Sequence, residues 1–382
     1  MANNNDNKVL NVPHLRFPEF SGEWKMCTIG ELTTKVGSGV TPRGGEAVYK
    51  TEGHPFVRSQ NVGLGNLLLD DIAFIDEETH LRQKSTELQF NDVLLNITGA
   101  SIGRSALVDK QIVGGNVNQH VCIIRTKENL VPSFICSFLL SNYGQRQIDS
   151  FQAGGNRQGL NFEQIKSIKI TIPSKDEQIK IAKLLRAIDE RIATQNKIID
   201  KLQSLIKGIA QNVASNNKPN IRLSECLECS SSTLQESDVC KNGTYPVYGA
   251  NGIVGYLDNY NTEKEAVYII KDGSGVGTVS YVTGKCSATG TLNTLQAKEG
   301  YSLQYLYYML KVFNFEPYKT GMAIPHIYFK DYGKAKIFCP SYTEQLKYAR
   351  LLSAIDNKLS AEQSILTDLS LQKQYLLRQM FI

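Results

Sequence analysis

Residues 172–192 read IPSKDEQIKIAKLLRAIDERI, and residues 339–359 read CPSYTEQLKYARLLSAIDNKL. The two stretches lie a constant 167 residues apart, and 11 of the 20 positions that begin at Pro173 and Pro340 are identical. A gap-free repeat of this length indicates that the chain contains two copies of one structural unit. The sequence therefore predicts two copies of one unit, and each copy ends in the same long helix.

Both copies carry a helix start followed by a heptad pattern. Ser174-x-x-Glu177 and Ser341-x-x-Glu344 have the spacing of a capping box. Roughly 40 helical residues at about 1.5 Å each predict a rod on the order of 60 Å long. Apolar residues recur at alternating steps of four and three, which predicts the seam of a coiled coil. The seam positions are Ile181, Leu185, Ile188, Ile192, Gln195, Ile199, Leu202, Ile206, Ile209 and Val213, then Tyr348, Leu352, Ile355, Leu359, Glu362, Leu366, Leu369, Lys373, Leu376 and Met380.

Gln195 and Glu362 occupy the same register of this seam. Polar residues at seam positions fix which helices pair and in which register, at some cost in stability. Two unrelated amphipathic helices, each packed on its own domain, are the alternative. The shared caps, seam and polar position argue against that alternative.

The composition is that of an ordinary globular chain. Of the 382 residues, 41% are hydrophobic and 21% are charged. No apolar run is long enough to cross a bilayer, and the polar start MANNNDNKV lacks the core of a signal peptide, so we expect a cytoplasmic protein with no membrane partner. A net charge of +5 suits a polyanionic partner without requiring one.

The second copy of the unit begins after the turn-rich segment 215–219 (SNNKP). The segment 266–282 (AVYIIKDGSGVGTVSYV) is similar to 92–108 (DVLLNITGASIGRSALV), and both read as two strands joined by a glycine turn. We expect an α+β (mixed) fold, in which two α/β domains are separated by two long antiparallel coiled-coil helices with an internal pseudo-twofold repeat. The expected segments are 1–20 (N-terminal extension), 21–172 (first domain), 173–216 (first long helix), 217–339 (second domain) and 340–382 (second long helix).

The sequence offers little for catalysis. It contains no G-x-x-x-x-G-K-[ST] phosphate loop, and the glycine clusters 99–103 and 273–277 lie between strands, where they predict hairpin turns. Its five histidines show no metal-ligand spacing, and the Cys226-Leu-Glu-Cys229 pair lacks a second pair, so reduced thiols are favoured over a zinc site. We therefore expect neither a catalytic residue nor a metal or cofactor in this chain.

Its loops carry instead the side chains that read DNA bases. Arg can pair bidentately with guanine, and Asn or Gln with adenine. At each position a solvated turn is the alternative, and His120 is predicted to be a hydrogen-bonded core residue. The candidates are Arg58, Gln60, Asn61, Arg104, Asn118, Gln119, Arg157 and Gln158 in the first domain, and Asn251, Lys271, Asn293, Thr294, Lys319 and His326 in the second.

Several segments together resemble the specificity (S) subunit of type I restriction–modification systems. The resemblance runs from about residue 12 to the end. It is carried by VPHLRFPEFSGEW (12–24), the hairpin 92–108, AGGNRQGLNF (153–162) and the two proline–EQ–helix repeats.

The resemblance implies two target-recognition domains, 21–172 and 217–339, each reading one half of a bipartite site in double-stranded DNA. It implies that the helices act as a ruler between the half-sites. It also implies two methyltransferase (modification) subunits as partners, with restriction/translocase subunits joining through them. S-adenosylmethionine, ATP and Mg²⁺ would bind those partners, and this chain would be a non-catalytic subunit.

Three alternatives stay open at this point. The chain could be the specificity part of another bipartite-site restriction–modification system, and it would then look much the same. It could be a coiled-coil adaptor whose globular domains bind proteins. A stand-alone DNA-modifying enzyme is the third alternative, and the failed search for catalytic motifs argues against it.

Overall fold

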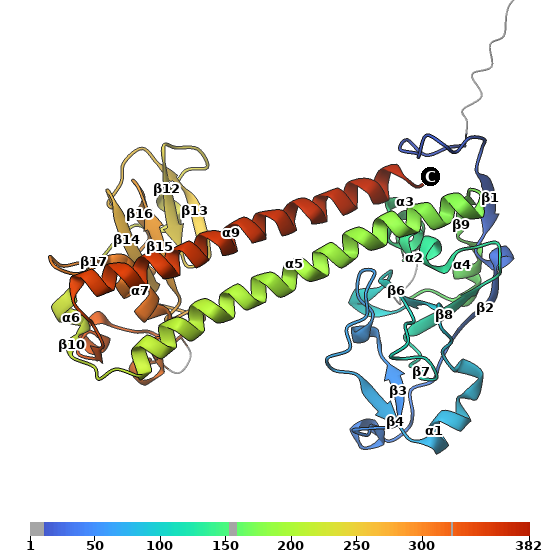
Figure 1. The fold of residues 1–382 in the computed structure, drawn as a ribbon, viewed down its shortest axis with the longest axis horizontal. Coiled ribbons are helices and arrows are strands. Elements are labelled where there is room, and N and C mark those ends of the chain that lie inside the picture. Colours follow the sequence, from blue (N-terminus) through green and yellow to red (C-terminus); the bar gives the residue numbers. More distant parts are fainter. Residues whose placement is uncertain (1–10, 153–158, 322–323) are drawn as a thin grey trace, which may run out of the picture. The chain divides into compact units, whose positions relative to one another are not determined.

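The computed structural model describes residues 11–152, 159–321 and 324–382, and the chain divides into two compact units. Unit 1 is Met1–Gln195 with Ile365–Ile382, and unit 2 is Asn196–Ser364. The two long helices, α5 (Lys175–Ser215) and α9 (Tyr342–Gln379), each contribute one end to each unit (Figure 1). The fold is thus mixed α/β, with two units and long helices.

Unit 1 contains three small sheets. β1 (Lys25–Thr28) pairs with β9 (Lys169–Ile172). A four-stranded antiparallel sheet has the order β2-β8-β5-β6, and a three-stranded sheet has the order β4-β3-β7 with β3 and β7 parallel. The strands are β2 (Thr33–Ser38), β3 (His54–Val57), β4 (Ala73–Ile75), β5 (Val93–Asn96), β6 (Ser105–Leu107), β7 (Asn116–Val117) and β8 (Val121–Thr126).

Unit 2 repeats this topology sheet for sheet. β10 pairs with β18, a four-stranded sheet has the order β11-β17-β14-β15, and a three-stranded sheet has the order β13-β12-β16 with β12 and β16 parallel. The repeat seen in the helices therefore extends through both globular parts. The strands are β10 (Ile221–Arg222), β11 (Leu227–Ser231), β12 (Tyr245–Gly249), β13 (Gly252–Leu257), β14 (Glu265–Ile270), β15 (Val279–Thr283), β16 (Ser287–Ala288), β17 (Leu292–Ala297) and β18 (Lys336–Ile337).

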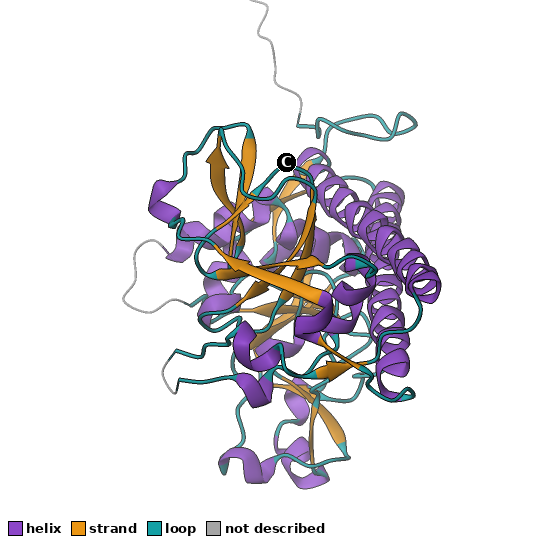
Figure 2. Cartoon of the chain, turned by 90° about the vertical axis from the view of Figure 1, so that its left-hand side faces the viewer, coloured by secondary structure: helices purple, strands orange, loops and turns teal. Residues whose placement is uncertain are grey.

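Short helices accompany these sheets, and Figure 2 colours helices and strands separately. Unit 1 has α1 (Glu77–Arg82), α2 (Pro132–Leu140), α3 (Asn142–Gln152) and α4 (Phe162–Ser167). Unit 2 has α6 (Leu223–Cys226), α7 (Leu303–Lys311) and α8 (Phe329–Tyr332). α2 and α7 are counterparts, whereas unit 2 has the 3₁₀ turn Glu316–Tyr318 where unit 1 has α3.

The same glutamine fixes the root of each long helix. Gln178 Oε1 accepts a hydrogen bond from Val131 N at 2.9 Å, and its Nε2 donates to Pro173 O at 3.1 Å. Gln345 repeats both bonds, with Ser302 N at 2.9 Å and Pro340 O at 2.9 Å. Both glutamines are buried, so each amide replaces water for backbone groups at the start of α2 or α7.

The predicted capping boxes form only in part. Ser174 Oγ accepts from Glu177 N at 3.4 Å, but the Glu177 carboxylate does not reach back to the helix start. It is buried instead against Arg16, whose Nε and Nη2 donate to it at 2.7 and 2.8 Å. The Glu177 carboxylate binds the Arg16 guanidinium instead of the backbone N–H at the helix start, because a bidentate charged pair is stronger than a neutral cap.

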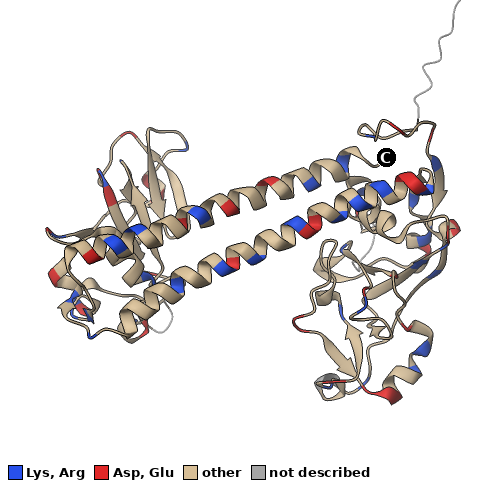
Figure 3. Ribbon diagram, viewed as in Figure 1, with Lys and Arg blue, Asp and Glu red and all other residues tan. Residues whose placement is uncertain are grey.

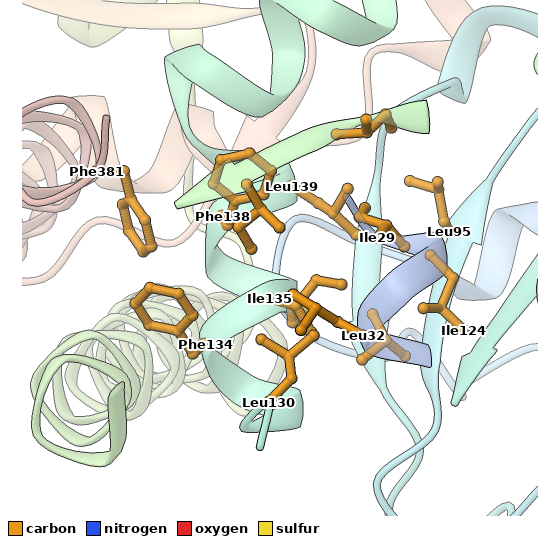
Figure 4. Close-up of a cluster of buried hydrophobic side chains, with 14 of the residues drawn as sticks. Ile29, Leu32, Leu95, Ile124, Leu130, Phe134, Ile135, Phe138, Leu139 and Phe381 are labelled. Carbon is orange, nitrogen blue, oxygen red and sulfur yellow. The ribbon is translucent and has the colours of Figure 1, made fainter. Parts of the chain in front are cut away.

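The core of unit 1 encloses α2 between the sheet and the ends of the two long helices. Phe381, just beyond α9, lies 5.2 Å from Phe134 and 6.1 Å from Phe138, measured between ring centroids (Figure 4). Ile181 and Leu185 of α5 belong to the same buried cluster. Burial of one such side chain stabilises the fold by about 1.5–3 kcal/mol.

Most of the heptad positions of the two helices are buried, although Ile192, Leu202 and Ile355 are among those that stay partly exposed. In unit 1 the buried ones include Ile181, Leu185, Ile188, Leu369, Leu376 and Met380, and in unit 2 Ile199, Ile206, Val213, Leu352 and Leu359. Lysine and arginine are interspersed with aspartate and glutamate along the remaining faces (Figure 3). Within the described ranges, no helix combines the length and apolar character that a bilayer span needs.

Two runs of β-type residues in the sequence, 66–69 and 165–172, do not form the full strands that their composition predicts. Residues 66–69 form no strand but a loop with a single bridge between Val62 and Leu67. Residues 165–168 are not extended, because α4 occupies 162–167 and the strand begins at Lys169. The overlooked signal is an Asn-x-x-Gln capping box: Asn161 Oδ1 accepts from Gln164 N at 2.8 Å, and Gln164 Oε1 accepts from Asn161 N at 2.9 Å.

Candidate nucleic-acid interface

Three loops of unit 1 meet where β5 ends. The buried Asn96 donates through Nδ2 to Ser59 O at 2.8 Å and to Ser101 Oγ at 3.1 Å. One residue beyond, Ile97 N donates to His120 O at 3.0 Å, and the Thr98 hydroxyl lies 2.6 Å from His120 Nδ1. The loops 58–61, 99–104 and 118–120 therefore share one end of the sheet, and together they hold most of the candidate residues.

A single carboxylate organises the first of these loops. Arg58 Nη2 donates to Asp71 Oδ2 at 3.2 Å and to Asp71 O at 2.8 Å, and its guanidinium lies 5.4 Å from the Tyr49 ring centroid. Gln60 donates to the same Asp71 carboxylate from an exposed position. Two long side chains are thereby held in place before any ligand arrives, which lowers the entropy lost on binding.

The remaining candidates of unit 1 differ in exposure. Arg104 and Gln119 are exposed. Asn61 is 1% exposed, and its amide bridges Arg58 N and Leu68 O, both at 2.9 Å. Asn118 is 7% exposed and accepts from His120 N at 3.0 Å. The two buried asparagines shape loops as the structure stands, while Arg104 and Gln119 are available to a partner.

Unit 2 assembles a matching loop cluster where β14 ends. Lys271 N donates to Thr291 O at 3.0 Å, and Ile327 N donates to Lys271 O at 2.9 Å. These bonds repeat the pattern of Ile97 in unit 1, which accepts from Leu160 N at 2.9 Å. The glycine-turn hairpins of the two units are therefore structural counterparts, as the sequence predicts, although the side chains around them differ.

A histidine–aspartate pair fixes the unit 2 cluster. His326 Nδ1 lies 2.7 Å from Asp272 Oδ1, and both side chains are 36% exposed. The His326 ring stacks on Tyr328, and Lys330 Nζ lies 5.2 Å from the centroid of the same tyrosine. A cation, an imidazole and a phenol thus face solvent together, which suits contact with phosphates and base edges.

The other unit 2 candidates are dispersed. Asn293 and Thr294 are 4% and 7% exposed in β17, and the Asn293 amide donates to Tyr332 Oη at 3.2 Å. Lys319 pairs with Glu316 at 2.6 Å. Asn251 is exposed at the tip of the β12–β13 hairpin. Arg157 and Gln158 of unit 1 lie outside the described residues, so their role stays a prediction.

Sequence reasoning missed the acidic organisers and misassigned one histidine. Asp71 and Asp272 do not match base-reading residue types, yet each positions a candidate side chain. His120 is half-buried in the turn that precedes β8, so it is not a core residue of the strand as predicted. An aspartate beside a candidate Arg or His loop is the signal that would have found the first two.

Among the described residues, no group of three or more His, Cys, Asp or Glu side chains is arranged so that it could hold a metal ion. Burial raises the pKa of the Cys226 thiol to about 12 and of the Cys229 thiol to about 11, with nearby Lys271 opposing the shift at Cys229. Raised thiol pKa values oppose the thiolate form that zinc binds.

Comparison with known proteins places this architecture in a family. A family model described as "Type I restriction modification DNA specificity domain" matches residues 21–204 and 219–370. A putative type I specificity subunit of Mycoplasma genitalium is 25% identical over 320 residues, which are 76% of this chain and 81% of that protein. The EcoKI specificity subunit of Escherichia coli K12 is 23% identical over 202 residues, which are 50% of this chain and 41% of that protein.

Solved structures share the fold. The S subunit of a type I restriction–modification system from M. genitalium has a TM-score of 0.67 at 20% sequence identity, covering 97% of this chain and 99% of that one. A chain from a structure of a type I restriction–modification complex has a TM-score of 0.54 at 17% identity, covering 93% and 96%. At these identities the likeness concerns the fold alone.

Proposed function

The chain belongs to the family of type I restriction modification DNA specificity domains, and from this membership we propose that it reads a bipartite DNA site, one half-site with each unit. As a specificity subunit its role is the recognition of DNA sequence. The observation that carries the two-reader proposal is the repeat itself. Unit 2 has the strand order of unit 1, yet the loops at the ends of β5 and β14 carry different side chains.

The exposed candidates supply the chemistry of reading. In unit 1, Arg104 suits guanine and Gln119 suits adenine, while Arg58 and Gln60 are held ready by Asp71. In unit 2, the exposed Asn251 and the partly exposed Lys271 and His326 would take these roles. The buried Asn61, Asn118, Asn293 and Thr294 would have to give up their internal surroundings to touch a base, so they fit loop support better.

The long helices would set the spacing between the half-sites. Support comes from the heptad face, which is the buried face of both α5 and α9 within each unit. A pairing seam of this kind resists bending and sliding, because each seam side chain inserts between residues of the facing helix. We therefore assign α5 and α9 the role of an antiparallel coiled-coil ruler, related by the pseudo-twofold repeat.

The outer faces of the same helices would dock two methyltransferase subunits. In unit 2, Ile198 and Leu205 of α5 are 36% and 48% exposed and lie one heptad apart, so they form one stripe beside the seam. In unit 1, Leu371 and Tyr375 of α9 are 58% and 53% exposed. Contiguous exposed apolar side chains favour a protein partner.

Exposed charged residues elsewhere on the two helices, including Lys183, Arg186, Glu190 and Arg350, would add polar contacts to the docked subunits. S-adenosylmethionine, ATP and Mg²⁺ would be held by the partners, and restriction subunits would join through the methyltransferases. The chain itself would perform no covalent step and would fix where the partners act.

A domain exchange tests the two-reader proposal. Residues 20–160 are replaced by the matching segment of a specificity subunit with another target, and the complex with methyltransferase subunits is purified. Sequencing of methylated DNA should then show one half-site changed and the other half-site and the spacer retained. A change in both half-sites or in neither contradicts the proposal, and an adaptor without DNA-reading function would show no sequence preference at all.

A further inference from the structure

A loop of unit 1 sits on the long helices at Gly65. Lys373 Nζ donates to Leu64 O at 3.1 Å and pairs with Asp189 at 2.5 Å. Gly65 N donates to Ser105 O at 2.9 Å. Gly65 has a φ of +99°, a backbone conformation that favours glycine, and a methyl group there would lie 3.2 Å from Lys373 Nζ and 3.5 Å from Leu140 Cδ1.

The repeat identifies the counterpart of this seat in unit 2. By the 167-residue offset, Asp356 is the counterpart of Asp189, and Ile206 is the counterpart of Lys373. Val131 and Ser302 occupy equivalent positions, because they donate to Gln178 and Gln345 respectively. This aligns α2 with α7, so Lys311 is the counterpart of Leu140. All three counterparts line one cavity of about 460 Å³. Its other lining residues are Gln203, Lys207, Ala210, Tyr308, Val312, Leu359 and Gln363.

The cavity exists because unit 2 lacks the segment that fills the seat in unit 1. β3 and β4 are joined by residues 58–72, whereas β12 and β13 are joined by Ala250 and Asn251 alone. A second cavity of about 430 Å³ shares Val312 and borders residues 313–318, which stand where unit 1 has α3. The helices of unit 2 are thus left uncovered at the place where unit 1 covers its own.

The charge of the seat indicates what would occupy it. A lysine lines the seat in both units. In unit 1 it is Lys373 of α9, and in unit 2 it is Lys311 of α7, with Lys207 of α5 as a second cation. Asp356 already accepts from the buried Tyr308 hydroxyl at 3.3 Å. Lys207 forms no ion pair within the described residues. An occupant must therefore bring backbone carbonyls or a carboxylate.

We propose that this cavity, the unit 2 seat, receives a glycine-containing loop with an acidic side chain from the methyltransferase subunit docked on α5. The inference rests on the proposed function, which supplies that partner. The filled seat of unit 1 supports it, because there a glycine-containing loop covers the same helix positions. Gln203 and Lys207 lie on the same turns of α5 as Ile198 and Leu205 but, at about 100° per residue, on the other flank of the buried Ile199 and Ile206, so the loop would reach around the helix from the docked subunit. The partner would donate in trans the contact that residues 62–67 make in unit 1.

Site-specific photocrosslinking of the purified complex tests the proposal. Gln203, which lines the seat, is replaced by p-benzoylphenylalanine, and the matched control carries the same group at the exposed neighbour Ser204. Irradiation should join Gln203→p-benzoylphenylalanine to an acidic loop of the methyltransferase subunit, located by peptide mass spectrometry, and the Ser204 control should not give this product. Crosslinking to DNA, equal crosslinking by both variants or none by Gln203 overturns the proposal.

Charge reversal provides a second measurement. Lys207→Glu should raise the dissociation constant of one methyltransferase copy about tenfold, as measured by mass photometry. Lys197→Glu, an exposed lysine of α5 that does not line the seat, should leave that constant unchanged. Equal affinities for the two variants contradict the unit 2 seat. Failure of the unaltered chain to assemble with methyltransferase at all contradicts the proposed function, so the two failures are distinguishable.

Discussion

Asp71 is not a candidate base-contact residue, but it holds two of the candidates in place. Its carboxylate accepts from both Arg58 and Gln60, and its backbone carbonyl accepts from Arg58 and from the buried Asn61. The loop is therefore ordered by contacts within the chain. Asp272 has the same relation to His326 in unit 2. Recognition of each half-site would then begin from side chains that are already positioned.

The substitution Asp71→Ala releases Arg58 and Gln60, and we expect DNA affinity at the first half-site to fall about tenfold because both side chains must then be ordered on binding. Fluorescence anisotropy of the methyltransferase complex with a labelled site measures this. The exposed neighbour Asp70 provides the control Asp70→Ala, which should bind as tightly as the unaltered chain. Equal affinities for the two variants would mean that Asp71 does not position the readers.

A carboxylate at the start of α1 forms a hydrogen bond with a histidine that lowers its pKa. Glu77 Oε2 lies 2.6 Å from His54 Nε2, and this hydrogen bond holds the pKa of Glu77 below its usual value of 4.5. A lowered carboxyl pKa contributes stability at pH above the unfolded-state pKa, and that stability is lost as pH falls through the folded-state value. The His54 ring also stacks on the buried His80, with centroids 3.8 Å apart.

Glu77→Gln should therefore unfold at lower urea than the unaltered chain at about pH 5.5, and the difference should disappear near about pH 3. Urea midpoints across this range measure the effect, which is small because Glu77 is exposed. Glu78→Gln is the control, since Glu78 pairs only with Arg82 on the helix surface. A gap between Glu77→Gln and the unaltered chain that is constant with pH would rule out the linkage.

At the scale of elements, a buried glutamine joins each long helix to the short helix beside it. Gln178 connects the start of α5 to the first residue before α2, and Gln345 does the same for α9 and α7. The start of each long helix is thereby held against the short helix of its own unit. The repeat preserves both the glutamine and its two bonds, although the residues that receive them differ.

We expect Gln178→Ala and Gln345→Ala each to destabilise their unit by about 2–3 kcal/mol, because each leaves two buried backbone groups without a hydrogen bond. Hydrogen-exchange mass spectrometry should report faster exchange at Val131 in the first variant and at Ser302 in the second. Gln374→Ala, at an exposed position of α9, is the control and should exchange as the unaltered chain does. Protection that is unchanged at Val131 and Ser302 would refute this role.

At the scale of the whole molecule, the repeat places two different loop clusters on one kind of scaffold. The hairpins, sheets and helix roots correspond pair by pair. The differences are concentrated in the segments 58–72 and 142–152 of unit 1 and in what replaces them. A scaffold of this kind can offer equivalent surfaces to two copies of one partner while reading two unlike sequences.

Insertion of one heptad into each long helix, after Gln195 in α5 and after Ser364 in α9, should lengthen the spacer between half-sites by about 3 base pairs. Seven residues add about 10 Å of helix, against about 3.4 Å per base pair. Sequencing of methylated DNA measures the spacer. A three-residue insertion at the same positions breaks the heptad register and should abolish methylation, so it serves as the contrast. A spacer that stays the same after the heptad insertion excludes the ruler.

Much of the fold was readable from the sequence because its signals are local. Heptad spacing identified the buried face of α5 and α9, and the glycine turns identified the β5–β6 and β14–β15 hairpins. The strand predicted at 66–69 was wrong because its apolar residues pack onto neighbouring elements, and the loop's backbone is fixed by Asn61 and Lys373 from other parts of the chain. Propensity reports nothing of such long-range partners.

The sequence by itself determined the repeat, the helices with their buried faces, the lack of catalytic motifs and the kinds of residue that could read DNA, because each depends on spacing along the chain. Only the tertiary structure decided which candidates are exposed: Arg104 and Gln119 are, whereas Asn61 and Asn293 are buried. It alone revealed Asp71, Asp272 and the unit 2 seat. Burial and pairing depend on residues far apart in sequence that folding brings within a few ångströms.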